Sequence, residues 1–178
     1  MSLLVSSDGW AINLVGPWER FIKHLLRLFQ RSALSRGRLY PDTPMVGVGV
    51  LIRDGDRYLI VKRAAEPDAG LWSIPGGLVE VGERASDAAI REAKEETGLD
   101  VEIVDLLGVV DKIVRDEASR VKFHFVIVDY LAEPRGGSMK AASDALDACW
   151  VKAEELPDYE LSPTLVELLR RVGIYPEG

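Results

Sequence analysis

The strongest local signal in the sequence lies in residues 77–99, which read Gly77-Leu-Val-Glu-Val-Gly-Glu-Arg-Ala-Ser-Asp-Ala-Ala-Ile-Arg-Glu-Ala-Lys-Glu-Glu-Thr-Gly-Leu99. Glu92, Glu95 and Glu96 stand at positions i, i+3 and i+4, so a helix would place their carboxylates on one face within about one turn. Like charges at this spacing repel one another unless divalent cations neutralise them. Mg²⁺ takes oxygen ligands of this kind and completes its shell with water and phosphate oxygens. Such a cluster would suit Mg²⁺ ions that polarise a phosphoryl group and activate an attacking water.

A solvated acidic face on an amphipathic helix is the other explanation of such a charge run, and the three glutamates alone favour it. The complete spacing changes this balance, because it follows the pattern G-x5-E-x7-R-E-U-x-E-E-x-G-U, where U is an aliphatic residue. All seven fixed positions are filled, by Gly77, Glu83, Arg91, Glu92, Glu95, Glu96 and Gly98. At frequencies of about 5–7% for each residue type, the match would arise by chance at roughly one start in 10⁸.

By this pattern, called the Nudix box, the chain resembles the Nudix hydrolase family over about residues 44–156. The resemblance implies an α/β/α sandwich with a mixed sheet, in which the box forms a loop, a helix and a second loop. Glu92, Glu95 and Glu96 would be catalytic residues that bind the metal, joined by the backbone carbonyl of Gly76.

Further roles in the box follow from the same resemblance. Glu83 and Arg91 would pair and brace the loop against the helix. Gly77 would let the loop turn tightly and approach a phosphate of the substrate. Leu99 fits the second aliphatic position, whereas Ala93 fills the first with a smaller side chain than the family usually carries.

Nudix enzymes hydrolyse a nucleoside diphosphate linked to another group, which implies Mg²⁺ as cofactor, with Mn²⁺ as a substitute. A carboxylate outside the box often acts as the base or as an extra metal ligand. Asp144 falls where many relatives carry an acidic residue, although a turn explains it equally well, and Asp147 is a weaker substitute. The identity of the base therefore stays open.

The residues around the box look like the group of ADP-ribose pyrophosphatases, so ADP-ribose or a related ADP-sugar is the first substrate expected. No proline stands about 15 residues after the box, as it does in many ADP-ribose hydrolases, and this leaves the substrate open. Arg63 is a candidate for binding a phosphate, and Trp72 or Phe125 for stacking on a base. Such aromatic residues more often belong to the core, and His124 between two phenylalanines favours a structural role.

Two other functions stay open. A nucleoside triphosphate pyrophosphohydrolase that removes damaged nucleotides would keep the box and change only the substrate. A non-catalytic module that senses nucleotides would be expected to lose carboxylates of the box, and none is lost here.

The composition fits one domain with a substantial core, since the chain has 178 residues of which 47% are hydrophobic. No apolar run reaches the roughly 18 residues that a membrane-spanning helix needs, and the start does not read as a signal peptide. Cys149 is the single cysteine, which excludes an internal disulfide and suits a reducing compartment. These features predict a cytoplasmic location.

The formal charge is unevenly distributed along the chain. Residues 1–40 carry six basic and two acidic side chains, a charge of +4, which leaves −11 on the rest of a chain whose total is −7. An acidic body argues against broad nucleic-acid binding, because few side chains there could displace counterions from a phosphate backbone. The expected partner is a small nucleotide.

Two parts of the chain are predicted, a helical extension at residues 1–40 and the Nudix domain at residues 41–178. The boundary is the turn-rich linker Tyr40-Pro-Asp-Thr-Pro44. From Trp18 to Leu34, apolar residues recur at helical spacing with basic residues between them. We expect this amphipathic helix to pack on the domain or to form a homodimer interface rather than to lie on a membrane.

The body alternates strands and helices, which predicts a mixed α/β fold with a sheet between helices. The predicted strands are 45–52, 58–62, 101–114, 121–131 and 146–151, with a loop at 132–143. The predicted helices are 85–97, closed by Gly98, and 162–172, with Pro163 in its first turn.

Overall fold

The computed structural model describes residues 38–139 and 145–176. The predicted helix between Trp18 and Leu34 and the candidate base Asp144 lie outside these residues. The elements in chain order are β1 (Met45–Asp54), β2 (Arg57–Arg63), β3 (Trp72–Ser73), β4 (Gly76–Leu78), α2 (Ala85–Thr97), β5 (Leu99–Arg115), β6 (Val121–Gly137), β7 (Ala145–Lys152), the 3₁₀ helix η1 (Ala153–Asp158) and α3 (Pro163–Arg171).

The strands within the described residues form one mixed sheet in the order β3-β2-β1-β6-β5, with β4 paired to β1 and β7 paired to β2. β1 and β6 run parallel, in register from Met45 opposite Phe125 to Ile52 opposite Ala132. The other pairs are antiparallel. The predicted mixed sheet between helices is confirmed.

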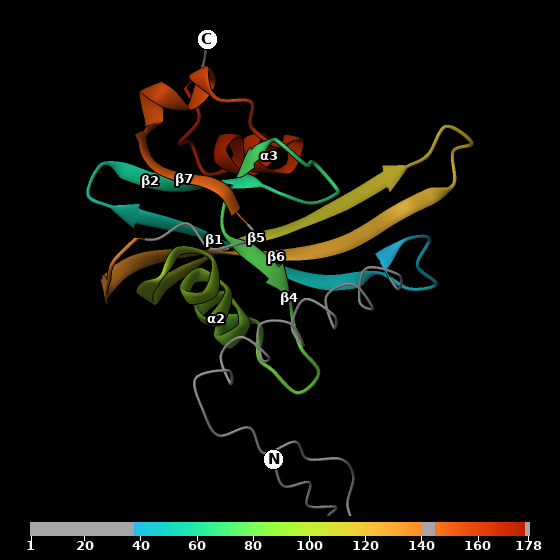
Figure 1. Ribbon diagram of the computed structural model, residues 1–178, viewed down its shortest axis with the longest axis horizontal. Coiled ribbons are helices and arrows are strands. Elements are labelled where there is room, and N and C mark those ends of the chain that lie inside the picture. The colour runs from blue at the N-terminus through green and yellow to red at the C-terminus, as the bar shows by residue number, and fades with distance from the viewer. Residues whose placement is uncertain (1–37, 140–144, 177–178) are drawn as a thin grey trace, which may run out of the picture. The chain divides into compact units, whose positions relative to one another are not determined.

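Helices α2 and α3 cover opposite faces of the sheet (Figure 1). Alternate residues of β1 supply the two cores, because successive side chains of a strand point to opposite faces. Val48, Val50 and Ile52 pack in the core beneath α2. Leu51 packs in the core beneath α3, with Leu165, Leu168 and Leu169. β1, which pairs with the strand that carries Gly76 and Gly77, is thus fixed from both sides.

Helix α2 has the predicted bounds. Its alanines Ala88, Ala89 and Ala93 are fully buried, so the helix backbone approaches the sheet closely. Gly98 ends the helix with a left-handed φ of 75°, and its N–H donates to the carbonyl of Lys94 at 3.0 Å. Glycine adopts this conformation without the steric cost that a Cβ brings.

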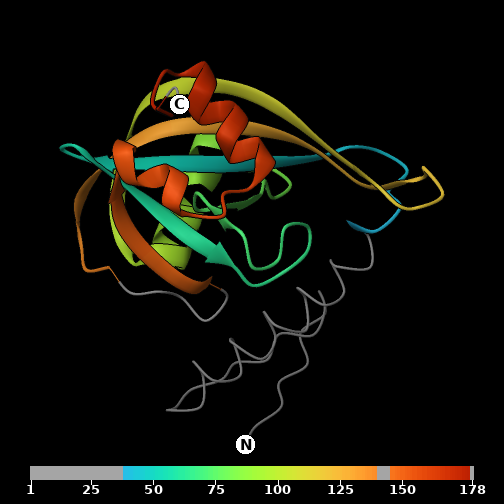
Figure 2. The same cartoon turned by 90° about the horizontal axis from the view of Figure 1, so that it is seen from above.

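The predicted loop that begins at residue 132 is wrong for residues 132–137, because β6 continues to Gly137. This extension pairs with the first residues of β5, from Leu99 opposite Gly137 to Ile103 opposite Ala132. β5 and β6 form a long antiparallel hairpin that reaches beyond the helices (Figure 2). The short strands β3 and β4 and the helix η1 were not predicted either.

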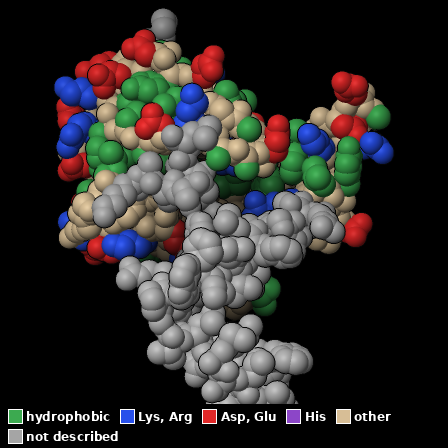
Figure 3. All heavy atoms as spheres, viewed as in Figure 1, with side chains coloured by type: hydrophobic (Ala, Val, Ile, Leu, Met, Phe, Trp, Pro, Cys, Tyr) green, Lys and Arg blue, Asp and Glu red, His purple; other side chains and the backbone are tan. Residues whose placement is uncertain are grey.

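Acidic, basic and hydrophobic side chains are interspersed over the described part of the face in Figure 3. None of the helices in the described ranges has the length and apolar character needed to cross a lipid bilayer.

Candidate active site

The box helix and strand β4 meet where Glu92 lies against Gly77. Glu92 is only 6% exposed. A Cβ added at Gly77 would stand 2.3 Å from its Oε1 atom, so the missing side chain of Gly77 is the space that the carboxylate occupies. Gly77 is held in register opposite Val48 of β1. The sheet therefore sets the position of this carboxylate through a glycine.

Gly76 brings a second carboxylate to the same strand, because its backbone N–H donates to Oε2 of Glu96 at 3.0 Å. Gly76 lies opposite Gly49, and the neighbouring hydrogen bond runs from the N–H of Val50 to the carbonyl of Pro75 at 2.8 Å. In this antiparallel pattern the N–H and C=O of Gly76 both point away from β1. Its carbonyl therefore faces the side where the Glu96 carboxylate lies.

Arg91 connects the loop of the box to the helix, as the resemblance implied. Its Nε donates to Oε1 of Glu83 at 2.8 Å and its Nη2 to Oε2 at 3.0 Å, a two-point contact. Nη2 also donates to the carbonyl of Leu78 at 3.1 Å. Nη1 donates to Oε1 of Glu92 at 2.6 Å and lies 3.6 Å from Oε2 of Glu95.

This network shifts the protonation of both partners. The hydrogen bond from Arg91 holds the pKa of Glu83 below its ordinary value of 4.5, and the same bond raises the pKa of Arg91. A carboxyl whose folded pKa is depressed stabilises the protein above its unfolded pKa and loses that contribution as the pH falls. The brace between loop and helix is therefore intact at neutral pH and weakens below about pH 4.5.

Replacing Arg91 by lysine should lower the free energy of unfolding by about 1–3 kcal/mol, because a single ammonium group cannot reproduce the two-point contact with Glu83 and the bond to Leu78. Urea denaturation at pH 7 measures this change. Arg135→Lys is the matched control, since Arg135 and its partner Glu102 are 57% and 63% exposed, and such pairs contribute little. Equal losses in the two variants would contradict the bracing role.

The oxygen atoms assembled here suit Mg²⁺, which takes carboxylate and carbonyl oxygens and keeps some water ligands. Glu92 and Glu96 are fixed against Gly77 and Gly76, whereas the side chain of Glu95 is 34% exposed. Within residues 38–139 and 145–176, no three acidic, histidine or cysteine side chains form a metal cluster on their own. Nη1 of Arg91 lies between two of the predicted ligands, 2.6 Å from Oε1 of Glu92 and 3.6 Å from Oε2 of Glu95.

The candidate substrate residues lie on other elements. Arg63 ends β2, and its Nε donates to the carbonyl of Pro67 at 2.9 Å. Trp72 in β3 makes an edge contact with Tyr159 at a ring distance of 5.3 Å and packs on the core beneath α3. Phe125 is 8% exposed. The contacts of Trp72 and the burial of Phe125 support the core explanation, and stacking of either ring on a base stays a prediction.

Asp147, the weaker candidate for the base, and His124 both lie in strands outside the box. Asp147 lies in β7, where its Oδ1 accepts from the N–H of Ala148 at 2.8 Å. His124 lies opposite Ile113 in the β5–β6 pair, and its structural role stays a prediction.

Two charged residues of low exposure were missed in the sequence, Asp129 on β6 and Lys112 on β5. Asp129 is 4% exposed and lies in one row with Gly49 and Gly108 of the neighbouring strands. A Cβ at Gly49 would stand 2.2 Å from its Oδ1 atom. The signal that could have found it is a charged residue at an inward position of an alternating strand.

Burial raises the pKa of Asp129 to about 7, and Arg171 partly offsets this effect. Between pH 4 and 7 the folded state then binds more protons than the unfolded state, so stability falls as the pH rises. Asp129→Asn should remove this dependence. The free energy of unfolding of the variant relative to wild type, measured by urea denaturation, should be higher at pH 8 than at pH 5 by roughly 1–4 kcal/mol. Glu117→Gln, at an exposed turn position, should show no such difference. A parallel pH profile for wild type and Asp129→Asn would contradict the assignment.

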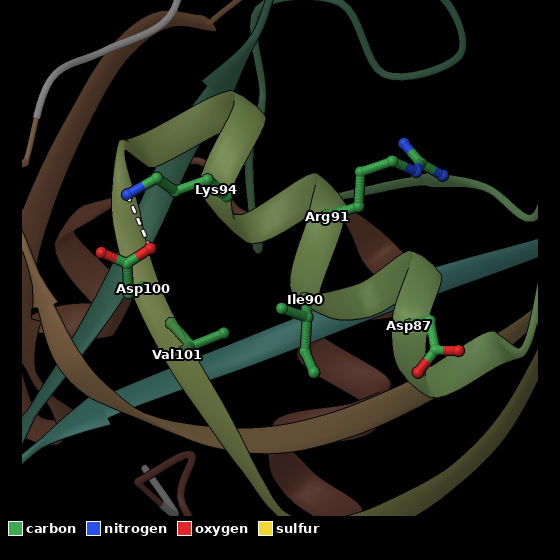
Figure 4. Close-up of a pocket in the computed structure, with 6 residues that line it drawn as sticks. All are labelled: Asp87, Ile90, Arg91, Lys94, Asp100 and Val101. Carbon is green, nitrogen blue, oxygen red and sulfur yellow. Dashed lines mark ion pairs between the residues drawn. The ribbon is translucent and has the colours of Figure 1, made fainter.

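A groove of about 470 Å³ lies between α2 and β5. Figure 4 shows its lining side chains, which come from α2 and from the start of β5, and Lys94 and Asp100 pair across it at 2.7 Å. The buried carboxylate of Glu92 is not among its lining residues. The groove shares Arg91 with the carboxylate network but does not include Glu92.

Known proteins share both sequence and fold with this chain. The NUDIX domain model matches residues 43–172. An ADP-ribose pyrophosphatase of Methanocaldococcus jannaschii is 34% identical over 153 residues, covering 86% of this chain and 85% of that protein. An 8-oxo-dGDP phosphatase of Mus musculus is 36% identical over 124 residues, which cover 67% of this chain and 36% of that protein.

The crystal structure of a MutT NUDIX hydrolase from Burkholderia pseudomallei superimposes with a TM-score of 0.66 at 34% identity, covering 74% of this chain and 99% of that chain. The family match includes the whole box and the strands that position it. The chain therefore belongs to the Nudix hydrolase family.

Proposed function

We propose that this Nudix hydrolase cleaves a diphosphate linkage in ADP-ribose or a related ADP-sugar, with Mg²⁺ bound at the box. The observation that carries the proposal is the placement of Glu92 and Glu96 against the backbone of Gly77 and Gly76. The similarity to an ADP-ribose pyrophosphatase along most of both chains supports the choice of substrate.

In this proposal Glu92, Glu95, Glu96 and the carbonyl of Gly76 hold the metal. Bound Mg²⁺ would polarise the phosphoryl group and lower the pKa of the attacking water. Glu83 and Arg91 keep the loop of the box against the helix, so that Gly77 stays close to Glu92. Arg63 binds a phosphate of the substrate through the Nη nitrogens that its contact with Pro67 leaves available.

A substrate panel tests the proposal directly. ADP-ribose, other nucleotide sugars, dinucleotides and nucleoside triphosphates are incubated with Mg²⁺, and phosphate release is followed after coupling to a phosphatase. We expect the highest kcat/KM for ADP-ribose or an ADP-sugar. No turnover of any compound would overturn the enzymatic proposal and favour a nucleotide sensor.

A second candidate is hydrolysis of a damaged nucleotide, favoured by the similarity to an 8-oxo-dGDP phosphatase. That relative is nearly three times as long as the matched region, which weakens the transfer of its substrate. Adding 8-oxo-dGDP and 8-oxo-dGTP to the panel separates the two candidates by their kcat/KM values.

We also propose that residues 1–40 form an extension outside the catalytic domain and take part in homodimer formation or packing. The start of the family match at residue 43 supports this boundary. Deleting residues 4–38 should change the mass measured by light scattering or lower the melting temperature. If both stay unchanged, the proposal for the extension fails and the catalytic proposal is unaffected.

A further inference from the structure

A buried ion pair joins Lys112 of β5 to Asp68, in the loop of residues 64–71 between β2 and β3. The two side chains are only 11% and 16% exposed. Lys112 is four residues beyond Gly108, where an added Cβ would stand 2.8 Å from Nη1 of Arg171 in α3. By the alternation of a strand, Lys112 points to the face of the sheet that α3 covers.

The loop of residues 64–71 follows Arg63 in the chain, and its last two residues are hydrogen-bonded to the backbone of Arg63. The N–H of Arg63 donates to the carbonyl of Leu71 at 3.0 Å, and the N–H of Gly70 returns a bond to Arg63 at 2.8 Å. Within the loop, the N–H of Leu71 donates to the carbonyl of Asp68 at 3.1 Å. The side chain of Arg63 is fixed to the same loop through Pro67. A movement of the loop would therefore move the guanidinium of Arg63.

Forming the Lys112–Asp68 pair costs free energy, both in the backbone of Asp68 and in the desolvation of two charges. Asp68 adopts a left-handed φ of 66°, which is uncommon for a residue other than glycine. Burial lowers the pKa of Lys112, Asp68 opposes this shift, and the nearby Arg63 adds to it. Removing two charges from water costs about as much as their attraction returns, so such a pair contributes more to a defined geometry than to stability.

The charges also leave an excess that suits an anion. Lys112 and Arg63 carry two positive charges, and Asp68 carries one negative charge close to them. These three groups together carry one net positive charge, and Glu66, the other carboxylate of the loop, is exposed. A phosphate oxygen is the natural partner for such a site, and arginine binds it through parallel N–H donors.

We propose that the Lys112–Asp68 pair is a positioning device, which fixes the loop of residues 64–71 so that Arg63 presents its guanidinium to a phosphate of the substrate. This role rests on the function proposed above. Lys112 acts through Arg63 and is a positioning residue. No local pattern in the sequence reveals this pair, because Asp68 and Lys112 are 44 residues apart.

The first test needs no substrate. Lys112→Met keeps the length of the side chain and removes its charge, while Asp68→Asn removes the partner charge and retains a residue that tolerates the left-handed conformation. Both variants should increase hydrogen exchange of the amides of Gly70 and Leu71 by about tenfold or more, and Lys112→Arg should restore protection. Arg135→Met, at an exposed pair on the same hairpin, should leave these amides unchanged. Unchanged exchange in both test variants would overturn the proposal.

The second test uses ADP-ribose with Mg²⁺, or 8-oxo-dGDP if the panel selects it. Lys112→Met should raise KM about tenfold with kcat within about twofold, because binding is lost while the metal site stays intact. In an Arg63→Ala background the same change should have no further effect on KM. Additive changes, or a fall in kcat as large as the rise in KM, would overturn the positioning role. If wild type cleaves neither compound, the proposed function fails, and the exchange experiment alone decides on the ion pair.

Discussion

Glu96→Gln and Glu95→Gln are each expected to lower kcat by about 10²–10⁴ while the protein stays folded. Glutamine has nearly the same shape as glutamate but lacks the negative charge that holds a divalent cation. A metal that stabilises charge in the transition state contributes several kcal/mol, and this contribution is lost with its ligand. Steady-state kinetics over a range of Mg²⁺ concentrations measure the change, and circular dichroism with urea denaturation reports the fold.

Asp87→Asn is the matched control, because Asp87 is an exposed carboxylate in the first turn of the same helix. Its kcat should remain within about twofold of wild type, since its loss affects only the helix dipole by a few tenths of a kcal/mol. Turnover close to wild type in both glutamine variants would refute the assignment of the box carboxylates to the metal.

Gly77→Ala should reduce kcat by about 100-fold and lower the free energy of unfolding by roughly 1–3 kcal/mol. The added methyl group would stand 2.3 Å from Oε1, 2.4 Å from Cδ and 2.7 Å from Oε2 of Glu92. The whole carboxylate must therefore move, because Gly77 itself is fixed by its pairing with β1. Kinetics with a Mg²⁺ titration and urea denaturation together measure both losses.

Gly136→Ala provides the comparison, since a Cβ there would meet only the Asp100 carboxylate, at an ordinary contact distance of 3.7 Å. It should leave kcat unchanged and alter stability by less than about 0.5 kcal/mol. If Gly77→Ala behaves like Gly136→Ala, then Glu92 does not need its position against β4.

The sequence predicted the box helix to the residue, because its signals are local. Three glutamates, a run of alanines and Gly98 fix the helix and its end within a few turns of chain. Strands β3 and β4 have two and three residues, too few for any periodicity to appear. β3 is placed by its pairing with β2, and β4 by its pairing with β1 over only three residues.

Residues 132–137 of β6 and the buried charges of Asp129 and Lys112 could not be predicted for a different reason. Pro134, Gly136 and Gly137 read locally as a loop, and only their pairing with the start of β5 makes them a strand. The burial of Asp129 depends on the neighbouring strands β1 and β5, and the burial of Lys112 depends on the loop of residues 64–71. Those neighbours are set by strand register and by the course of the loop at 64–71, neither of which can be read from one segment.

The contacts of Arg91 have a consequence for how the enzyme is assembled. This guanidinium already serves as a built-in counter-ion for Glu83 and Glu92, and it reaches Glu95 as well. Folding of the box therefore does not have to wait for a cation, unlike the folding of small domains that stay unfolded until a metal arrives. The concentration of free Mg²⁺ would then change the rate of catalysis but not the amount of folded enzyme.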